Sequence, residues 1–226
     1  MYSQITEKKN LVKLLQFLPT AGRLHPGAVD SVNPGRDIMF TFDNPHRYAH
    51  GDVMRNVQLN YEKMRQVVLS QGYDKVWIVE EDMIPPANAL EKLLEVAAPV
   101  VTGLYGLRSG KPLPNIFGGG KEGITGNVGW MYIRDHWGET VDCAGGCMGC
   151  VVLDRSVMEG FTFILDPNNP KFPHNGAPDI PLMDYCAKNG FQAKARLDVI
   201  CGHCKTTGDV IWPDKEQAWR LNGLPG

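Results

Sequence analysis

One stretch decides how this chain folds, and it reads VWIVEEDMIPP at residues 76–86. Its first four residues are apolar, which is typical of a strand that is covered on both faces of a sheet. Three carboxylates follow, and two prolines then end the strand. Because open α/β sheets bind their ligands at the carboxyl ends of the strands, the sequence predicts a ligand site at this point.

The acidic triplet indicates a divalent metal. Side chains two residues apart project alike from an extended chain, so we expect Glu80 and Asp82 to approach one ligand while Glu81 points elsewhere. Carboxylates this close repel each other unless a cation neutralises them. Hard oxygen ligands favour Mg2+ or Mn2+, which commonly bind substrate phosphate oxygens as well. An acidic surface turn is the alternative that spacing alone leaves open.

The composition is that of an ordinary globular protein. The chain has 226 residues, of which 43% are hydrophobic and 21% charged, and we expect one domain. No apolar stretch approaches the roughly 20 residues that a membrane-spanning helix needs. Residues 1–10 lack the apolar core of a secretory signal, so a cytoplasmic location is expected. A net charge of -2 provides no large basic field, which leaves nucleic acid only as a transient acceptor.

Hydrophobic periodicity predicts alternating strands and helices. A helix over residues 54–71 shows apolar side chains every three or four positions, and a second helix covers residues 180–189. The other expected elements are a helix near residues 90–97, a short helix before Gly160, and strands at residues 11–18, 37–42, 76–79, 100–105, 129–133, 148–153 and 196–201. This alternation predicts an α/β fold with a mixed, mainly parallel sheet flanked by helices.

The segment between residues 109 and 129 departs from this alternation. It is rich in Gly and Pro and is too long for an ordinary connection, so we expect a lid or a binding loop. Its GGGK run at residues 118–121 does not satisfy GxxxxGK[ST], which excludes a Walker phosphate loop.

The six cysteines all lie in the second half of the chain and suggest two alternative metal sites. A CxxxCxxC run has the spacing by which three thiolates hold an iron–sulfur cluster, and a later Cys-Gly-His-Cys run could add ligands for structural zinc. The cluster would use Cys143, Cys147 and Cys150, and the zinc site would pair these thiols with Cys201, His203 and Cys204. Several of these thiols instead adjoin apolar strands, as small core residues do. In the absence of a secretory signal we expect them to be reduced.

Taken in order, these features resemble the nucleotide-sugar-dependent glycosyltransferases of the GT-A fold, in particular an inverting, family-2-like group that includes many polysaccharide and phage sugar transferases. The resemblance covers residues 11–205. It is carried by Pro19 and Thr20 after the first strand, Arg55 at a helix start, the acidic triplet at the DxD position, VVTGLYGLR at residues 100–108, residues 141–155, Asp179 and His203. It implies one Rossmann-like domain, with a nucleotide-binding half at about 11–108, an acceptor-side half at about 109–205 and a tail at 206–226.

The resemblance also implies roles for individual residues. Asp82 is the expected metal ligand, with His203 completing the site and Glu80 near the metal or the ribose, where the family has Asp. A buried or zinc-bound histidine is the alternative for His203, and a surface arginine is the alternative for Arg55. The residues expected to hold the nucleotide are Pro19, Thr20, Arg23, Arg55, Glu80 and Glu81.

The base that would deprotonate the acceptor hydroxyl is expected at the start of the late helix. Asp179 is similar to the family's catalytic aspartate, although Pro178 stands where the family has glutamate. A helix cap explains an aspartate at this position equally well. Asp184, five residues further along the same helix, is the reserve candidate.

The resemblance implies a metal-dependent glycosyltransferase that uses Mn2+ or Mg2+ and a nucleoside-diphosphate sugar as donor. The sequence leaves the acceptor open: it can be a glycan, a protein or a modified nucleic-acid base. The reaction is expected to proceed with inversion. A metal-dependent nucleotidyltransferase is the alternative enzyme, because it also needs carboxylates and a divalent ion at an α/β nucleotide site. A zinc- or cluster-binding module is the alternative from another class.

Overall fold

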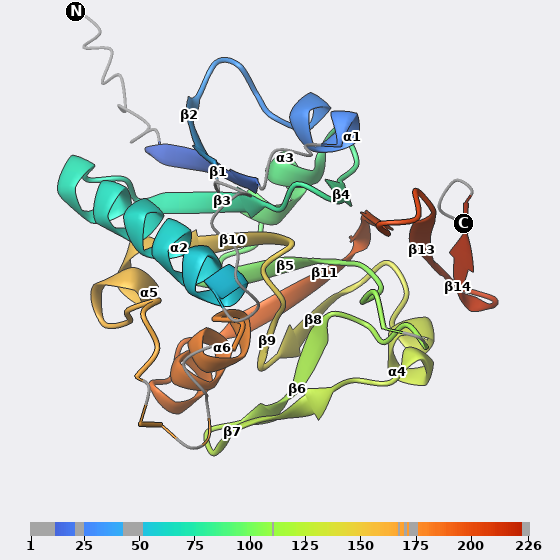
Figure 1. The fold of residues 1–226 in the computed structure, drawn as a ribbon. Helices are drawn as coiled ribbons and strands as arrows, with labels where there is room; N and C mark the ends of the chain where they lie inside the picture. The colour runs from blue at the N-terminus through green and yellow to red at the C-terminus, as the bar shows by residue number, and fades with distance from the viewer. Residues whose placement is uncertain are drawn as a thin grey trace, which may run out of the picture.

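The computed structural model describes residues 12–20, 25–42, 52–109, 111–166, 168–169, 171 and 176–222. Within them, a seven-stranded sheet forms the centre of the protein (Figure 1). In spatial order its strands are β2 (Asp37–Phe42), β1 (Leu14–Thr20), β3 (Lys75–Val79), β10 (Cys150–Asp154), β5 (Val100–Leu104), β11 (Ala193–Ile200) and β8 (Thr140–Cys143). Strands β10 and β8 run antiparallel to their neighbours and the others run parallel. The expected mixed, mainly parallel sheet is therefore confirmed.

Helices cover both faces of this sheet (Figure 1). The core on one face is shared by α2 (Asp52–Gln71), α5 (Arg155–Glu159) and α6 (Asp179–Lys188), and the core on the other by α1 (Pro26–Asp30) and α3 (Ala89–Leu94). Side chains alternate along β3, with Val76 and Ile78 in the first core and Trp77 and Val79 in the second. This strand is thus apolar on both faces, as its sequence predicts.

No helix in the described ranges is both long enough and apolar enough to cross a lipid bilayer.

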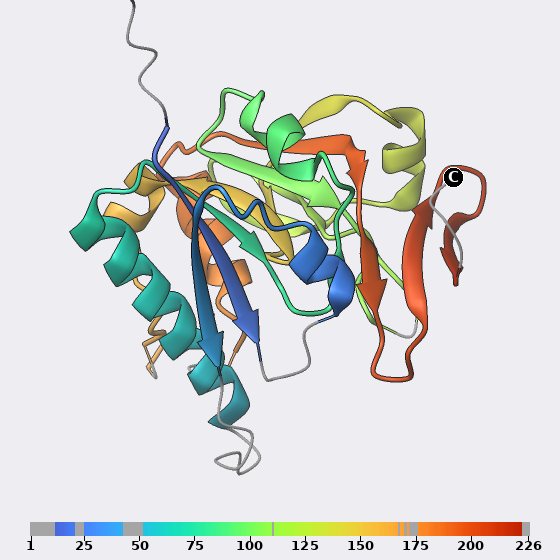
Figure 2. The same cartoon turned by 90° about the horizontal axis from the view of Figure 1, so that it is seen from above.

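Two smaller sheets extend from the centre. One contains β7 (Gly123–Asn127), β6 (Ile116–Gly120) and β9 (Gly145–Gly146), and the other contains β14 (Ala218–Leu221), β13 (Val210–Asp214), β12 (Gly202–Cys204) and β4 (Met83–Ile84). Figure 2 shows the C-terminal strands standing beside the main sheet. Because β12 pairs with β4, His203 lies opposite Met83, one residue after the acidic triplet. The described part of the expected tail at 206–226 contains β13 and β14, which extend this small sheet beyond β12.

Two expected elements are wrong. Residues 129–133 were expected as a strand but form the start of α4 (Trp130–Asp135), in which only Ile133 is buried and 70% of Met131 is exposed. A short apolar run does not distinguish a strand from a helix. The expected lid or loop at residues 109–129 contains the β6–β7 hairpin. Its strands pair through the backbone, and their sequence lacks the alternation of apolar and polar residues that would predict a strand.

The first strand also differs from its expected limits. It begins at Leu14 rather than at residue 11 and includes Pro19, which was expected to end it. Pro19 lies beyond Phe17, the last β1 residue that pairs with β3. A missing amide is tolerated where a strand has a partner on one side only. The expected helices at 54–71 and 180–189 are confirmed as α2 and α6.

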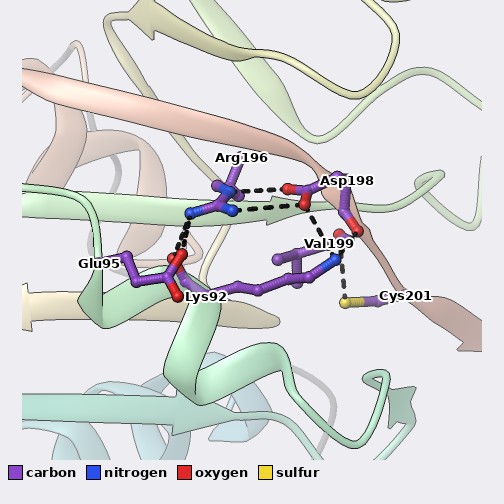
Figure 3. Close-up of polar contacts among 6 residues, drawn as sticks. All are labelled: Lys92, Glu95, Arg196, Asp198, Val199 and Cys201. Carbon is purple, nitrogen blue, oxygen red and sulfur yellow. Dashed lines mark hydrogen bonds and ion pairs between the residues drawn. The ribbon is translucent and has the colours of Figure 1, made fainter.

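A charged network joins α3 to β11 (Figure 3). The Arg196 guanidinium lies 2.9 Å from a Glu95 oxygen and 2.8 Å from an Asp198 oxygen, and the Lys92 ammonium lies 2.9 Å from the other Asp198 oxygen. Arg196 also donates a hydrogen bond to the Lys92 carbonyl oxygen at 2.9 Å. One guanidinium therefore satisfies groups on both elements, which a point charge cannot do.

Replacing Arg196 by Met should lower the free energy of unfolding by about 1–2 kcal/mol, because the carbonyl and the two carboxylates lose a shared, half-buried donor. Urea denaturation measures this change. Arg196→Lys should recover less than half of the loss. Lys194→Met, which removes an ion pair with the exposed Asp142, is the matched control and should cost less than about 0.5 kcal/mol. Equal losses for both methionine variants would contradict a bridging role.

Candidate functional site

The candidate site lies where the strand order of the main sheet reverses. From β1 the chain continues to β2 on one side, and from β3 it continues toward β5 on the other. The carboxyl ends of β1 and β3 therefore border a crevice of the kind in which α/β sheets bind ligands. The Thr20 hydroxyl, at the end of β1, donates a 2.6 Å hydrogen bond to a Glu81 carboxylate oxygen across this crevice. The first strand and the acidic triplet are thus brought together.

A cavity of about 380 Å³ opens at this point. This volume lies within the range of roughly 300–1,000 Å³ that is typical of small-molecule sites. Pro19 and Met54 contribute apolar surface from β1 and α2. Its polar lining comes from Thr20, Asn60, Tyr61, the acidic triplet, Arg108 and Asp179.

The acidic triplet forms a turn and not the extended end of a strand. Strand β3 stops at Val79, and the Met83 amide donates a 3.0 Å hydrogen bond to the Glu80 carbonyl oxygen. Glu81 consequently lines the cavity together with Glu80 and Asp82. The expectation that Glu81 points elsewhere is wrong, because it assumed the two-residue repeat of an extended chain.

Glu80 and Asp82 are placed in contrasting environments. The Tyr61 hydroxyl donates a 2.8 Å hydrogen bond to Glu80. Burial and the nearby Asp82 carboxylate raise the pKa of Glu80 to about 7, although the Tyr61 hydrogen bond lowers it. Burial also raises the pKa of Asp82, but interactions with His203 and Arg108 outweigh burial and hold the pKa below its ordinary value. At neutral pH, Asp82 is therefore the fixed negative charge of the pair.

His203 is oriented toward Asp82 by a backbone contact. Its Nδ1 lies 2.8 Å from the carbonyl oxygen of Gly106, which can only accept, so Nδ1 carries a proton. In the neutral ring, Nε2 then presents a lone pair toward Asp82 Oδ2, 3.5 Å away. Two acceptors facing each other require a cation between or beside them, which can be a proton on Nε2, a metal, or the Arg108 guanidinium that lies 2.8 Å from the same oxygen. Metal-binding histidines are commonly held in this way by a second-nitrogen hydrogen bond.

The second oxygen of Asp82 also fits a cation. Asp82 Oδ1 is buried and has no hydrogen-bond partner, which is costly for a carboxylate unless a ligand satisfies it. No three His, Cys, Asp or Glu side chains in the described part of the chain are arranged to hold a metal by themselves. Asp82 and His203 would therefore supply two ligands and leave other positions to water and phosphate oxygens, as is usual for Mg2+.

Asp179 faces the same cavity from the first residue of α6. Its carboxylate accepts a 2.9 Å hydrogen bond from the Ile180 amide and another from the Cys147 thiol. Burial raises the pKa of Asp179, and these hydrogen bonds offset only part of the rise. The side chain does not cap the helix from outside, because the N-cap residue is Pro178. A carboxylate with a raised pKa at the edge of a cavity is suited to accept a proton.

Arg55, one of the expected nucleotide-binding residues, is not brought into this group. Arg55 lies on the exposed side of α2 and donates to Gln58 at 3.2 Å, and it does not line the cavity. Arg23 lies outside the described residues. The basic residue that does line the cavity is Arg108, whose Nη1 lies 2.8 Å from Asp82 Oδ2. The sequence signal for Arg108 was its position just after β5, a parallel strand near β3.

Asp184, the reserve candidate for the base, lies away from the cavity. It is buried and pairs with Lys171 at 2.9 Å and with Lys188 at 2.8 Å. One carboxylate oxygen also accepts from the Ile124 amide at 3.4 Å, which ties α6 to β7. The backbone there passes so close that a Cβ on Gly123 would lie 2.2 Å from the carboxylate. The contacts of Asp184 are thus those of a structural residue.

The Asp184→Asn variant should lose about 2 kcal/mol of unfolding free energy at pH 7, because two ammonium groups lose a buried partner. Burial raises the pKa of Asp184, but Lys188 and Lys171 outweigh it and lower the pKa below its ordinary 3.8. A lowered pKa in the folded state stabilises above the unfolded value and is lost as the pH falls through the folded value. The difference from the parent protein should therefore shrink below about pH 4 in urea titrations. A constant difference down to pH 2 would contradict the ion pairs.

The cysteines do not form the expected clusters. Cys150 and Cys201 contact each other in the core, Cys147 contacts Asp179, and Cys143 lies on β8. All six cysteines lie in described ranges and are free thiols. None of the metal-ligand groups expected for zinc or an iron–sulfur cluster is assembled among the described residues.

Comparison with known proteins gives a fold relationship. No protein-family model matches the chain, and no curated protein matches its sequence. Among solved structures, A197 from STIV is similar with a TM-score of 0.60 and 15% identity, over 95% of this chain and 96% of that one. The inositol-1-phosphate CTP transferase from T. maritima has a TM-score of 0.41 and 14% identity, over 82% and 85% of the chains. The first shows a shared overall fold, and the second is too distant to support an inference.

Proposed function

We propose that this protein is a metal-dependent glycosyltransferase of the GT-A type, which transfers a sugar from a nucleoside diphosphate to an acceptor hydroxyl with inversion. The observation that supports it best is the pairing of Asp82 with His203 at the crevice between β1 and β3. Asp82 Oδ1 has no hydrogen-bond partner there, and Asp82 Oδ2 lies 3.5 Å from His203 Nε2 and 2.8 Å from Arg108 Nη1. Such a pair is suited to a divalent cation that also holds a diphosphate.

In this proposal each part of the cavity has one task. Asp82 and His203 hold Mn2+ or Mg2+, which when bound supplies Lewis-acid stabilisation of the departing diphosphate. Pro19 and Thr20 lie on the nucleotide side, at the end of β1. Glu80, held by Tyr61, accepts hydrogen bonds from the donor. Asp179 accepts the proton of the acceptor hydroxyl while that oxygen attacks the anomeric carbon from the face opposite the leaving group.

A thermal-shift screen tests this function directly. Nucleoside diphosphates, nucleotide sugars and nucleoside triphosphates are each added with and without Mn2+, since a ligand of the folded state raises the unfolding temperature. We expect stabilisation by at least one nucleoside diphosphate and its sugar, and only with Mn2+. The selected donor is then incubated with glycan, protein and nucleic-acid acceptors. Release of pyrophosphate rather than a nucleoside diphosphate would instead identify a nucleotidyltransferase.

A further inference from the structure

Arg108 occupies the position of a counter-ion in the proposed cation site. Its Nη1 lies 2.8 Å from Asp82 Oδ2, the same oxygen that lies 3.5 Å from His203 Nε2. The guanidinium is close to half exposed, with 46% of the side chain accessible, whereas Asp82 is mostly covered. Arg108 is therefore an accessible cation that rests on a buried carboxylate, and it can leave without disturbing the core.

The backbone that carries Arg108 is fixed to the same site. The Gly106 carbonyl oxygen accepts the proton of His203 Nδ1, and Tyr105 accepts a hydrogen bond from the Gly149 amide at 2.8 Å. The loop is closed at its base by the Gly106–Pro114 pairing and by the Leu107 amide, which donates to the Leu113 carbonyl oxygen at 2.8 Å. The main chain is thus anchored up to the residue before Arg108. A change in the Arg108 contact is then a change of side chain and not of backbone.

We propose that Arg108 is a side-chain latch: it closes the cation site by pairing with Asp82, and it turns to the donor diphosphate when a divalent cation takes its place. This inference rests on the proposed function, because it uses the same cation site. A cation and a guanidinium compete for Oδ2, so arrival of the first releases the second beside the cavity that Arg108 already lines. A diphosphate that then binds the freed guanidinium prevents its return. Cation and diphosphate consequently favour each other's binding, and the coupling must be reciprocal.

Arginine is suited to both positions. Its planar guanidinium matches carboxylate and phosphate oxygens with paired N–H donors and stays charged at every relevant pH. A lysine keeps the charge but offers a single ammonium, so it should still compete with the cation while binding the diphosphate less well. This difference separates the two tasks of Arg108 in one experiment.

The test measures binding of Mn2+ from the electron paramagnetic resonance of the free ion, with and without methylene diphosphonate as a diphosphate probe. In the parent protein, the probe should tighten Mn2+ binding about tenfold, within the usual range of roughly 5- to 150-fold for coupled sites. Arg108→Ala should bind Mn2+ alone several-fold more tightly than the parent and lose most of the coupling. Arg108→Lys should resemble the parent for Mn2+ alone and show weaker coupling. Arg134→Ala, which removes a positive charge from exposed α4, is the control and should change neither value.

Two outcomes separate a failure of the latch from a failure of the proposed function. If Asp82→Asn weakens Mn2+ binding but Arg108→Ala changes neither the affinity nor the coupling, the latch is wrong and the cation site stands. If Asp82→Asn leaves Mn2+ binding unchanged, the proposed cation site is wrong, and the proposal for Arg108 is wrong as well.

Discussion

Replacing Asp82 by Asn should abolish the Mn2+-dependent rise in unfolding temperature that nucleoside diphosphates produce. The amide has nearly the shape of the carboxylate but no charge, so it cannot hold a divalent cation beside His203. Oδ1 is without a partner and Oδ2 pairs with exposed Arg108, so the loss of the charge should not unfold the protein. Thermal shift with the donor selected by the screen, with and without Mn2+, measures the effect.

The matched control for this change is Asp142→Asn. Asp142 lies on β8, is exposed, and pairs with Lys194 away from the cavity, so the same loss of charge should leave Mn2+-dependent stabilisation intact. Retained stabilisation in the Asp82 variant would place the cation elsewhere in the protein. Loss of stabilisation in both variants would indicate a response to overall charge and not a site.

The Asp179→Asn variant should bind the donor normally and lose about 10²- to 10⁴-fold in turnover, the usual contribution of a general base. Asn keeps the helix start and can still contact Cys147, but it cannot accept a proton. Release of nucleoside diphosphate with a confirmed acceptor measures kcat, and thermal shift measures donor binding in the same variant. The raised pKa of Asp179, caused by burial, predicts that activity of the parent falls on the acid side at a higher pH than an ordinary aspartate would give.

Asp142→Asn again serves as the control, with turnover within twofold of the parent. A decrease of less than tenfold in the Asp179 variant would show that another group takes the proton. A loss of donor binding together with turnover would instead place Asp179 at the nucleotide, and the base would have to be sought elsewhere along the cavity.

The apolar stretch of β3 and the carboxylates after it could be recognised from the sequence because strand, stop and charge all lie within eleven residues. The long helix α2 was equally clear, since apolar side chains recur every three or four positions along residues 54–71. The turn that the acidic triplet forms could not be recognised from the sequence, because two-residue alternation of side chains holds only while the chain stays extended. The orientation of Glu81 was wrong for that reason.

Contacts between distant segments account for the site contacts that the sequence did not reveal. Arg108, Tyr61 and Cys147 contact Asp82, Glu80 and Asp179, respectively, and in each pair the partners are far apart along the chain. Asp184 was a reasonable candidate by position, but its lysine partners are visible only in the folded chain. Periodicity describes one element at a time, and side-chain partners depend on how elements pack.

The strand that carries His203 lies in a part of the fold that is held less firmly than the carboxylates. It belongs to a small sheet in which β12 is three residues long and its partner β4 is two, whereas the carboxylates follow directly from the large central sheet. Short peripheral pairings open more often than central ones during native-state fluctuations. Opening of the β12–β4 pairing would move the His203 imidazole away from Asp82 while the rest of the molecule stays folded. An ion held by Asp82 and His203, as proposed, is therefore expected to be lost under conditions milder than those that denature the protein.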